Sequence, residues 1–253
     1  VGGFDKVYEL NKDFRNESID STHNPEFSMI EFYEAYADYK DMIKLTEEVI
    51  SNANKSINGK NETEFFGHKI NLKTPFQVIT MKDAIKKYSG INVDKLNDKE
   101  LLKLKEKYNL EHYGKLTRGW VIQLLFEHFA EPKLIQPVFI IEHPRETTPL
   151  CKWSRKDSSL IERFELFIGG FEISNGYSEL NDPIIQRKLL EEQAKELKEG
   201  VEDANPMDED FIKAIEQGMP PTGGVGIGTD RLTMVLTGSN SIKDVILFPM
   251  MKN

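Results

Sequence analysis

Two glutamates in the segment RFELFIGGFEIS have a spacing that suits a metal ion. The central Gly-Gly pair tolerates positive φ angles, so we expect two strands joined by a two-residue turn, with Glu165 opposite Ser174. Glu165 and Glu172 would then be diagonal neighbours on one face, roughly 7 to 8 Å apart at the backbone. Two such carboxylates repel each other unless a cation lies between them, and flexible oxygen ligands favour Mg²⁺ or Mn²⁺ over zinc. Pairing of the glutamates with Arg163 or a lysine is the alternative.

Residues 6–33 are predicted to place a row of polar and aromatic side chains on one surface. The stretches KVYELNKDFRNE and PEFSMIEFY flank the turn-rich SIDSTHN and predict an antiparallel hairpin. Because strand side chains alternate between faces, one face carries Arg15, Glu17, Phe27, Met29, Glu31 and Tyr33. Such a row could hold a phosphate, a stacked base and an amine, although an ordinary solvated face is the alternative. The other face carries Phe14, Ile30 and Phe32, which we expect in the core.

The glycine-rich stretch GGVGIGTDR is a third candidate for ligand binding. Thr229 breaks the G-x-G-x-x-G pattern and no Gly-Lys-Ser/Thr follows, which excludes the Rossmann and P-loop motifs. Glycines before a helix let a ligand approach the backbone, and Arg231 falls in the predicted first turn, where phosphate oxygens are favoured. Tight packing alone would also explain the glycines.

The elements that must position these residues mix helices and strands. We expect a helix at 36–54, a polar loop at 51–64 and a run of short helices at about 75–135, one of them capped by Thr80 with Asp83. Strands follow in VFIIEH and in the Gly-Gly hairpin. Asp182 and Pro183 should open a helix that closes near Gly200, and a short helix should run from about 208 to 218.

The composition bounds the class of protein. With 39% hydrophobic residues the chain can bury a core, and no apolar run approaches the length of a membrane span. Cys151 is the only cysteine, the five histidines lack zinc spacing, and VGGFDKVYEL does not resemble a signal peptide, so we expect a cytoplasmic protein. Its 33 basic and 42 acidic residues argue against nucleic-acid binding by composition alone, but several carboxylates stand where cations would bind.

Three stretches of the chain resemble one family. FRNESIDSTHNPEFSMIEFYEAYADY resembles motif 2 of class II aminoacyl-tRNA synthetases, and GVGIGTDRLTMVL followed by SIKDVILFP resembles motif 3. GGFEISNGYSELNDP is very similar to the lysine-specific branch. The resemblance implies an α+β fold, with an antiparallel β-sheet flanked by helices. It also implies a catalytic domain over residues 1–253, with a helical insertion at about 75–135 between motifs 2 and 3.

The resemblance also implies a role for each matching residue. Arg15 and Arg231 would be the catalytic residues: Arg15 would bridge the ATP α-phosphate and the lysine carboxylate, and Arg231 would bind the γ-phosphate. Asp230 is expected to brace the fold. The ATP-binding residues would be Arg15, Glu17, His23, Asn24, Phe27, Glu165, Gly228 and Arg231, with Gly226 leaving room for the nucleotide. The lysine-binding residues would be Arg15, Glu31, Tyr33, Asn175, Tyr177 and Glu179. The metal ligands would be Glu165 and Glu172.

The implied reaction is ATP-dependent activation of L-lysine and transfer of the lysyl group to tRNA(Lys), with Mg²⁺ or Mn²⁺ as the metal. Family members carry an anticodon-binding domain and the dimer-forming motif 1 upstream, so we expect this chain to be a truncated piece of a homodimer. A ligase that attaches lysine or an analogue to a protein and a non-catalytic scaffold paralogue are the rivals. Aspartate or asparagine specificity fits Glu31, Tyr33 and Glu179 less well.

Overall fold

A computed structural model describes residues 1–16, 19–112, 114–198 and 206–250. The predicted site residue Glu17 and the predicted helix end near Gly200 lie outside the described residues. No helix in the described part of the chain combines the length and the apolar character needed to cross a membrane.

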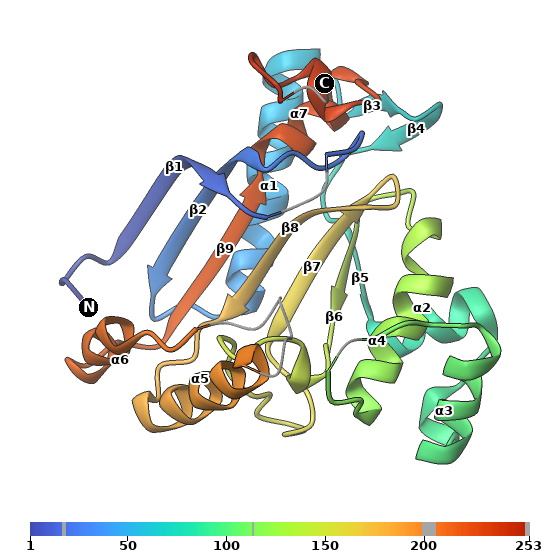
Figure 1. The fold of residues 1–253 in the computed structure, drawn as a ribbon. Helices are drawn as coiled ribbons and strands as arrows, with labels where there is room; N and C mark the ends of the chain where they lie inside the picture. The colour runs from blue at the N-terminus through green and yellow to red at the C-terminus, as the bar shows by residue number, and fades with distance from the viewer. Residues whose placement is uncertain (17–18, 113, 199–205, 251–253) are drawn as a thin grey trace.

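A seven-stranded sheet forms the centre of the molecule (Figure 1), with the strand order β1-β2-β9-β8-β7-β6-β5. All neighbouring strands are antiparallel except β5 and β6, which are parallel. The strands are β1 (Lys6–Phe14), β2 (Glu26–Ala35), β5 (Gln77–Thr80), β6 (Val138–Ile141), β7 (Arg163–Ile168), β8 (Phe171–Ser178) and β9 (Thr222–Gly228). A separate hairpin joins β3 (Glu62–Phe65) to β4 (His68–Asn71). The predicted α+β class is confirmed.

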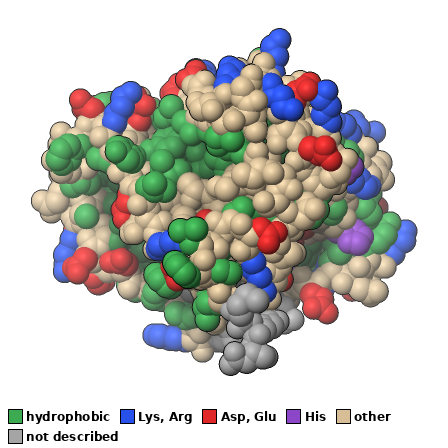
Figure 2. Space-filling model, turned by 90° about the horizontal axis from the view of Figure 1, so that it is seen from above, with side chains coloured by type: hydrophobic (Ala, Val, Ile, Leu, Met, Phe, Trp, Pro, Cys, Tyr) green, Lys and Arg blue, Asp and Glu red, His purple; other side chains and the backbone are tan. Residues whose placement is uncertain are grey.

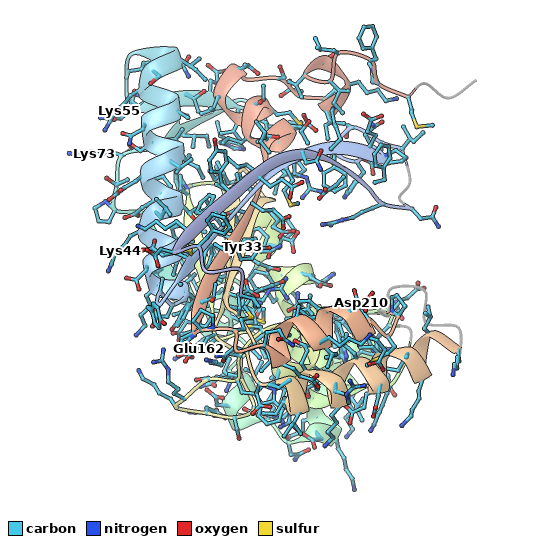
Figure 3. The ribbon with its side chains drawn as sticks, turned by 90° about the vertical axis from the view of Figure 1, so that its left-hand side faces the viewer. Tyr33, Lys44, Lys55, Lys73, Glu162 and Asp210 are labelled. Atoms are coloured by element: carbon cyan, nitrogen blue, oxygen red, sulfur yellow. The ribbon has the colours of Figure 1, made fainter. Side chains whose placement is uncertain are left out.

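Helix α1 (Tyr39–Asn58) covers one face of the sheet (Figure 3). It begins at a capping box made by Asp38 and Asp41 and ends at Gly59, whose φ of 65° is left-handed. The prediction of a polar loop from residue 51 is wrong, because tertiary contacts satisfy the polar side chains there. Asn54 donates to the Lys60 carbonyl at 2.7 Å, and Asn58 donates to the Leu236 carbonyl at 2.9 Å.

The predicted ligand-binding residues of β2 lie on the face of the sheet opposite to α1. A Cβ at Gly223 would lie 3.0 Å from Met42 of α1, whereas a Cβ at the next residue, Gly224, would meet the Tyr33 ring on the other face at 2.6 Å. Ile30 and Phe32 pack against the core on the α1 side, as predicted. The odd-numbered residues of β2 therefore face away from α1.

The segment 75–135 contains three helices and one unpredicted strand, β5. Thr80 caps α2 (Met81–Ser89) by accepting from the Asp83 N–H, as predicted. The helices pack on the β5–β7 end of the sheet around a second core that includes Leu125, Phe126 and Phe167. The other elements of the segment are η1 (Val93–Lys95), α3 (Asp98–Lys107), α4 (Arg118–Phe129) and η2 (Glu131–Lys133).

The remaining helices follow the predicted signals. The Asp182 carboxylate accepts from the N–H groups of Ile184 and Ile185 at the start of α5 (Pro183–Lys198). Asp208 caps α6 (Glu209–Glu216). The chain continues after β9 with α7 (Thr229–Thr237) and η4 (Ile242–Asp244), and η3 (Arg145–Thr147) precedes β7.

One expected core residue is exposed. Phe14 is 74% exposed, because β1 is an edge strand whose α1-side face no described residue covers. Its neighbours on that face, Tyr8 and Leu10, are also exposed, although they pair with Phe32 and Ile30. Figure 2 shows hydrophobic side chains gathered on the side of the molecule where β1 lies.

Candidate active site

Strand β9 forms the floor of the candidate site, and its glycines keep that floor open. A Cβ at Gly224 would overlap the Glu179 carboxylate, and one at Gly226 would lie 3.1 Å from Met29 Sδ. Side chains on β9 would therefore displace those of the neighbouring strands. The glycine-rich stretch that begins at Gly223 is thus a central strand between β2 and β8, which lets a ligand lie against the sheet.

Two rows of residues run across four strands on this face. The strand pairings align the first row as Glu31, Gly226, Asn175 and Glu165. They align the second row as Tyr33, Gly224, Tyr177 and Arg163. The sheet therefore brings together residues that the sequence analysis assigned to lysine and to a metal, and it adds Arg163, which that analysis considered only as an ion-pair partner.

A β-bulge at Ile173 corrects the predicted register of the Gly-Gly hairpin. Phe167 pairs with Glu172 as predicted, but Glu165 pairs with Asn175 and not with Ser174. The extra residue on β8 turns Asn175 and the odd-numbered residues after it onto the face that carries Glu172. Asn175 confirms this arrangement, since its Nδ2 donates to Glu172 Oε1 at 3.1 Å.

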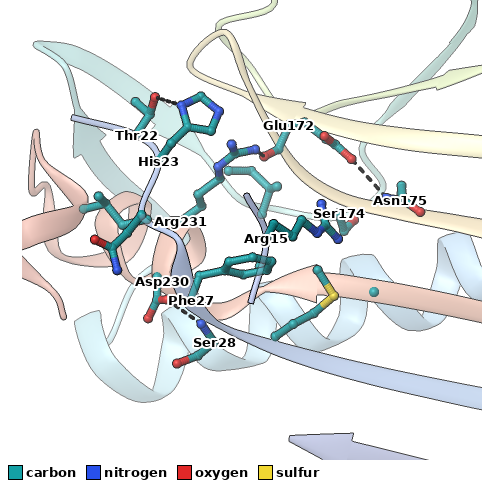
Figure 4. Close-up of a pocket in the computed structure, with 16 residues that line it drawn as sticks. Arg15, Thr22, His23, Phe27, Ser28, Glu172, Ser174, Asn175, Asp230 and Arg231 are labelled. Atoms are coloured by element: carbon teal, nitrogen blue, oxygen red, sulfur yellow. Dashed lines mark hydrogen bonds between the residues drawn. The ribbon is translucent and has the colours of Figure 1, made fainter. Parts of the chain in front are cut away.

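A cavity of about 240 Å³ lies at one end of this face (Figure 4). Elements far apart in the sequence contribute to its walls: the β1–β2 hairpin, β8, β9 and α7. It is lined by most of the predicted nucleotide-site residues, namely Arg15, His23, Asn24, Phe27, Gly226, Gly228 and Arg231, together with Glu172 and Asn175. The structure therefore brings the two predicted catalytic arginines into one cavity.

The two arginines are held by different contacts. The Arg15 guanidinium lies over the Phe27 ring, 5.0 Å from its centroid, which is the ring predicted to stack on a base. Arg231 donates from Nη1 to the Glu172 carbonyl at 2.9 Å. Asp230 accepts from the Ser28 N–H at 2.6 Å and so joins α7 to β2, the bracing role expected for it. Both cations can meet an anionic ligand in this cavity (Figure 4).

The turn between β1 and β2 fixes the orientation of His23. The Asp20 carboxylate accepts from the N–H groups of Thr22 and His23 and lies 2.9 Å from His23 Nδ1. Although desolvation acts in the opposite direction, these hydrogen bonds hold the pKa of Asp20 well below its usual range. His23 Nδ1 is thereby occupied and Nε2 is left for a ligand. Asp20 was missed in the sequence, where it reads as an ordinary turn residue.

Two tyrosines and two glutamates, Tyr33, Tyr177, Glu31 and Glu179, surround Gly224, two residues along β9 from Gly226 of this cavity. Tyr33 donates to Glu31 at 3.4 Å, and the Glu179 carboxylate and the Tyr33 ring both lie over Gly224, on the same face of the sheet. Burial and then the charge of Glu31 raise the pKa of Glu179 to about 8. Burial raises the pKa of Glu31 as well. Within the described residues neither carboxylate forms an ion pair, so the space between them favours a cation.

Glu172 of the predicted metal pair lines the cavity of about 240 Å³, whereas Glu165 does not. Glu165 and Glu172 line a space of about 400 Å³ together with Gln123, Glu127 and Glu131. Burial, and next the charge of Glu165, raise the pKa of Glu172. Burial, and next the charges of Glu165, Glu127 and Glu172, raise the pKa of Glu131 to about 8. Mutual repulsion of this kind is what a divalent cation relieves.

The donor set suits magnesium that is bound together with a nucleotide. Among the described residues, no three acidic, histidine or cysteine side chains converge closely enough to hold an ion by themselves. Mg²⁺ commonly takes one or two carboxylates and completes its octahedron with water and substrate phosphates. Glu165 and Glu172, the second of which also lines the cavity that holds Arg15 and Arg231, fit that pattern.

The comparison with known proteins agrees with this geometry. The profile of the family described as "tRNA synthetases class II (D, K and N)" matches residues 1–252. The chain belongs to this family. A class II synthetase domain accordingly accounts for the antiparallel sheet and for the position of motif 3 on β9 and α7.

The most similar individual proteins include several lysine–tRNA ligases. The chain is 50% identical to the lysine–tRNA ligases of Methanoculleus marisnigri and Clostridium novyi and 46% identical to that of Saccharolobus solfataricus. Each alignment covers the whole chain. The chain spans about half the length of these relatives, 50% to 51%.

Two residues beside the candidate site, Arg163 and Glu131, were not predicted as site residues from the sequence. Arg163 begins β7, contacts Glu165 and lies over the Tyr177 ring, 5.7 Å from its centroid. Glu131 comes from η2, far from the hairpin in sequence. Equal parity with Glu165 along the strand could have indicated Arg163, but nothing in the sequence near Glu131 points to a site.

Proposed function

We propose that this class II synthetase domain activates L-lysine with ATP and that the whole protein transfers the lysyl group to tRNA(Lys). The observation that carries the proposal is the carboxylate of Glu179, which has no ion-pair partner among the described residues and lies over Gly224 beside Tyr33, with Tyr177 on the next strand. A lysine ε-ammonium supplies the missing charge, whereas an aspartate side chain would add a further anion. The names of the similar ligases support the same substrate.

In the proposed first step, a lysine carboxylate oxygen attacks the α-phosphorus of ATP. The new oxygen–phosphorus bond forms as the bond from that phosphorus to the β-phosphate oxygen breaks, which gives lysyl-adenylate and pyrophosphate. Because both reactants are anions, the barrier is mainly charge repulsion and positioning. Arg15 and Arg231 would neutralise the phosphates, and Phe27 would carry the adenine. No general base is needed, because the carboxylate is already ionised.

Magnesium, or manganese in its place, would be held by Glu165 and Glu172 and would supply further neutralisation of the phosphates. The assignments of His23 and Asn24 to the phosphates, of Gly228 and Gly226 to nucleotide clearance, and of Asn175 to the lysine carboxylate belong to the same proposal. They are supported by the shared cavity that these residues line.

Amino-acid-dependent exchange of pyrophosphate into ATP, run on the full-length protein with each of the twenty amino acids, tests the proposal. We expect exchange with lysine and none with aspartate or asparagine. Exchange with aspartate in place of lysine would refute the specificity. Lysine-dependent exchange without charging of tRNA(Lys) would favour a ligase that attaches lysine to another acceptor.

We propose that the whole protein is a homodimer located in the cytoplasm, where translation takes place. The exposed apolar face of β1, made by Tyr8, Leu10 and Phe14, supports the dimer because it is available to pack against a second copy. Analytical ultracentrifugation of the full-length protein should give twice the monomer mass, and a monomer at micromolar concentration would contradict this proposal.

A further inference from the structure

Arg163 touches both halves of the site without lining the nucleotide cavity. Its Nη2 donates to Glu165 Oε1, and its Nη1 donates to Thr147 Oγ1 at 3.3 Å. The Cζ atom of its guanidinium lies over the Tyr177 ring, 5.7 Å from the ring centroid. Glu165 belongs to the proposed metal pair and Tyr177 to the wall of the proposed lysine pocket, so a single planar group supports one member of each.

The Arg163 side chain is only 13% exposed, and burying a charge is costly unless it is paired. Arginine stays protonated throughout the accessible pH range, and here Glu165 Oε1 accepts from its Nη2. The guanidinium is thus a permanent cation at the point where the two glutamates repel each other.

Glu165 has few other partners to orient it. His143 lies nearby, with Nδ1 3.9 Å from Glu165 Oε2, but its Nε2 donates to the Ile140 carbonyl at 3.1 Å. A separation of 3.9 Å is too long for a hydrogen bond, and His143 Nδ1 has no hydrogen-bond partner among the described residues. Within the described part of the chain, Arg163 is therefore the side chain that donates to Glu165.

We propose that Arg163 is a positioning residue that fixes the Glu165 carboxylate for a divalent cation and braces Tyr177 against the lysine side chain. The planar fork of arginine can donate along its edge and support a ring with its face at the same time. The inference rests on the proposed function, because it assigns this residue a part in both of its ligand sites.

Two binding measurements on the full-length protein test the inference apart from activity. The first is L-lysine affinity by calorimetry. The second is Mn²⁺ affinity by water-proton relaxation in the presence of a non-hydrolysable ATP analogue. We expect Arg163→Gln to weaken Mn²⁺ binding roughly 10- to 100-fold, as loss of a residue that orients a metal ligand does, and to weaken lysine binding several-fold. Arg163→Lys keeps the charge but lacks the planar fork, so it should show smaller losses in both.

Arg155→Gln is the matched control. Arg155 also forms an arginine–carboxylate ion pair, since its Nε lies 2.7 Å from Oε1 of the buried Glu162. Glu162 directly precedes Arg163 in the chain. We expect it to lower the melting temperature while both affinities stay at the wild-type value. Wild-type affinities in Arg163→Gln, with only a lower melting temperature, would overturn the inference and leave the proposed function standing. If Arg163→Gln does not fold, the same comparison is made with Arg163→Lys. Failure of the wild-type protein to bind lysine would count against the proposed function itself.

Discussion

Asn175 donates a hydrogen bond from Nδ2 to Oε1 of Glu172, 3.1 Å away, although three positions along a regular strand would place them on opposite faces. The extra residue in the bulge, Ile173, makes the contact possible. It puts the predicted metal ligand Glu172 on the same face as Asn175 and Tyr177. The proposed lysine pocket and metal pair therefore share one surface because of a single inserted residue.

Replacing Glu172 with glutamine should separate stability from activity. The change removes one of two buried charges that repel each other but keeps an acceptor for Asn175, so we expect the melting temperature of the unliganded protein to rise. At saturating lysine, pyrophosphate exchange should fall and require roughly tenfold or more additional Mg²⁺. Calorimetry and a magnesium titration of the exchange rate measure the two effects. An unchanged magnesium requirement would remove Glu172 from the metal site.

Arg231→Ala should lower exchange at limiting ATP by roughly a hundredfold, about 3 kcal/mol, as loss of one preorganised donor does. The guanidinium is held at the cavity by the Glu172 carbonyl, so the wild-type protein has little reorganisation to do when ATP binds. Arg187→Ala is the control, since it breaks an exposed ion pair with Glu209 far from the cavity. Equal effects of the two substitutions on kcat/KM for ATP would show that Arg231 has no special role.

Lysine binding should tighten as the pH rises toward 8. The pKa of Glu179 is raised from near 4.5 to about 8, so the empty pocket holds a proton at neutral pH that must leave when the ammonium binds. Each pH unit below 8 should weaken lysine binding by up to about tenfold, while the ε-ammonium stays charged. Calorimetry between pH 6 and 9 measures the slope, and Glu179→Gln should abolish it together with most of the affinity. A pH-independent affinity in the wild-type protein would contradict the role of Glu179.

The raised pKa of Glu179 also makes the stability of the folded protein depend on pH. Because the folded state holds the Glu179 proton up to about pH 8 and the unfolded chain releases it near pH 4.5, the free energy of unfolding of the empty protein should fall across this window. Glu179→Gln should remove that contribution. A Glu179→Gln variant whose unfolding free energy keeps the wild-type dependence on pH would argue against the raised pKa.

Gly224→Ala should fill the lysine pocket, since the added methyl group would overlap the Glu179 carboxylate and press on the Tyr33 ring. We expect the KM for lysine to rise sharply and the KM for ATP to change little. Gly223→Ala is the control on the same strand. Its methyl group points to Met42 and α1, so it should cost stability without changing the KM for lysine. A rise in the lysine KM in both variants would show a general distortion of β9.

Local sequence signals predicted much of the fold. The β1–β2 hairpin, the Thr80 cap and the helix start at Asp182 each depend on residues close in the chain, and all three are present. The bulge at Ile173 was not predicted, because the Gly-Gly turn signal gives a regular register between β7 and β8, whereas β8 also pairs with the distant strand β9. The exposure of Phe14 was missed for a related reason, since alternation gives the face of a strand but not what covers that face.

In the candidate site, too, local patterns were predictable from the sequence and contacts between distant segments were not. Phe27 and Glu31 could be assigned to one face from parity along β2, and Arg15, which follows the end of β1 at Phe14, lies over the Phe27 ring. Arg163 contacts Tyr177 and Thr147, which belong to other elements. Glu131 lies near Glu165 and Glu172, which are far from it in the sequence. Their roles depend on packing between segments, which single-sequence patterns do not contain.

A crystal structure of the protein with a sulfamoyl analogue of lysyl-adenylate tests most directly whether the separated motifs meet around one nucleotide and one cationic amino acid. The adenine should stack on Phe27, the sulfamoyl group should contact Arg15, and the ε-ammonium should lie within hydrogen-bond distance of Glu179. An analogue bound with its lysine side chain away from Glu179, or with its adenine outside the cavity that Arg231 lines, would contradict the account.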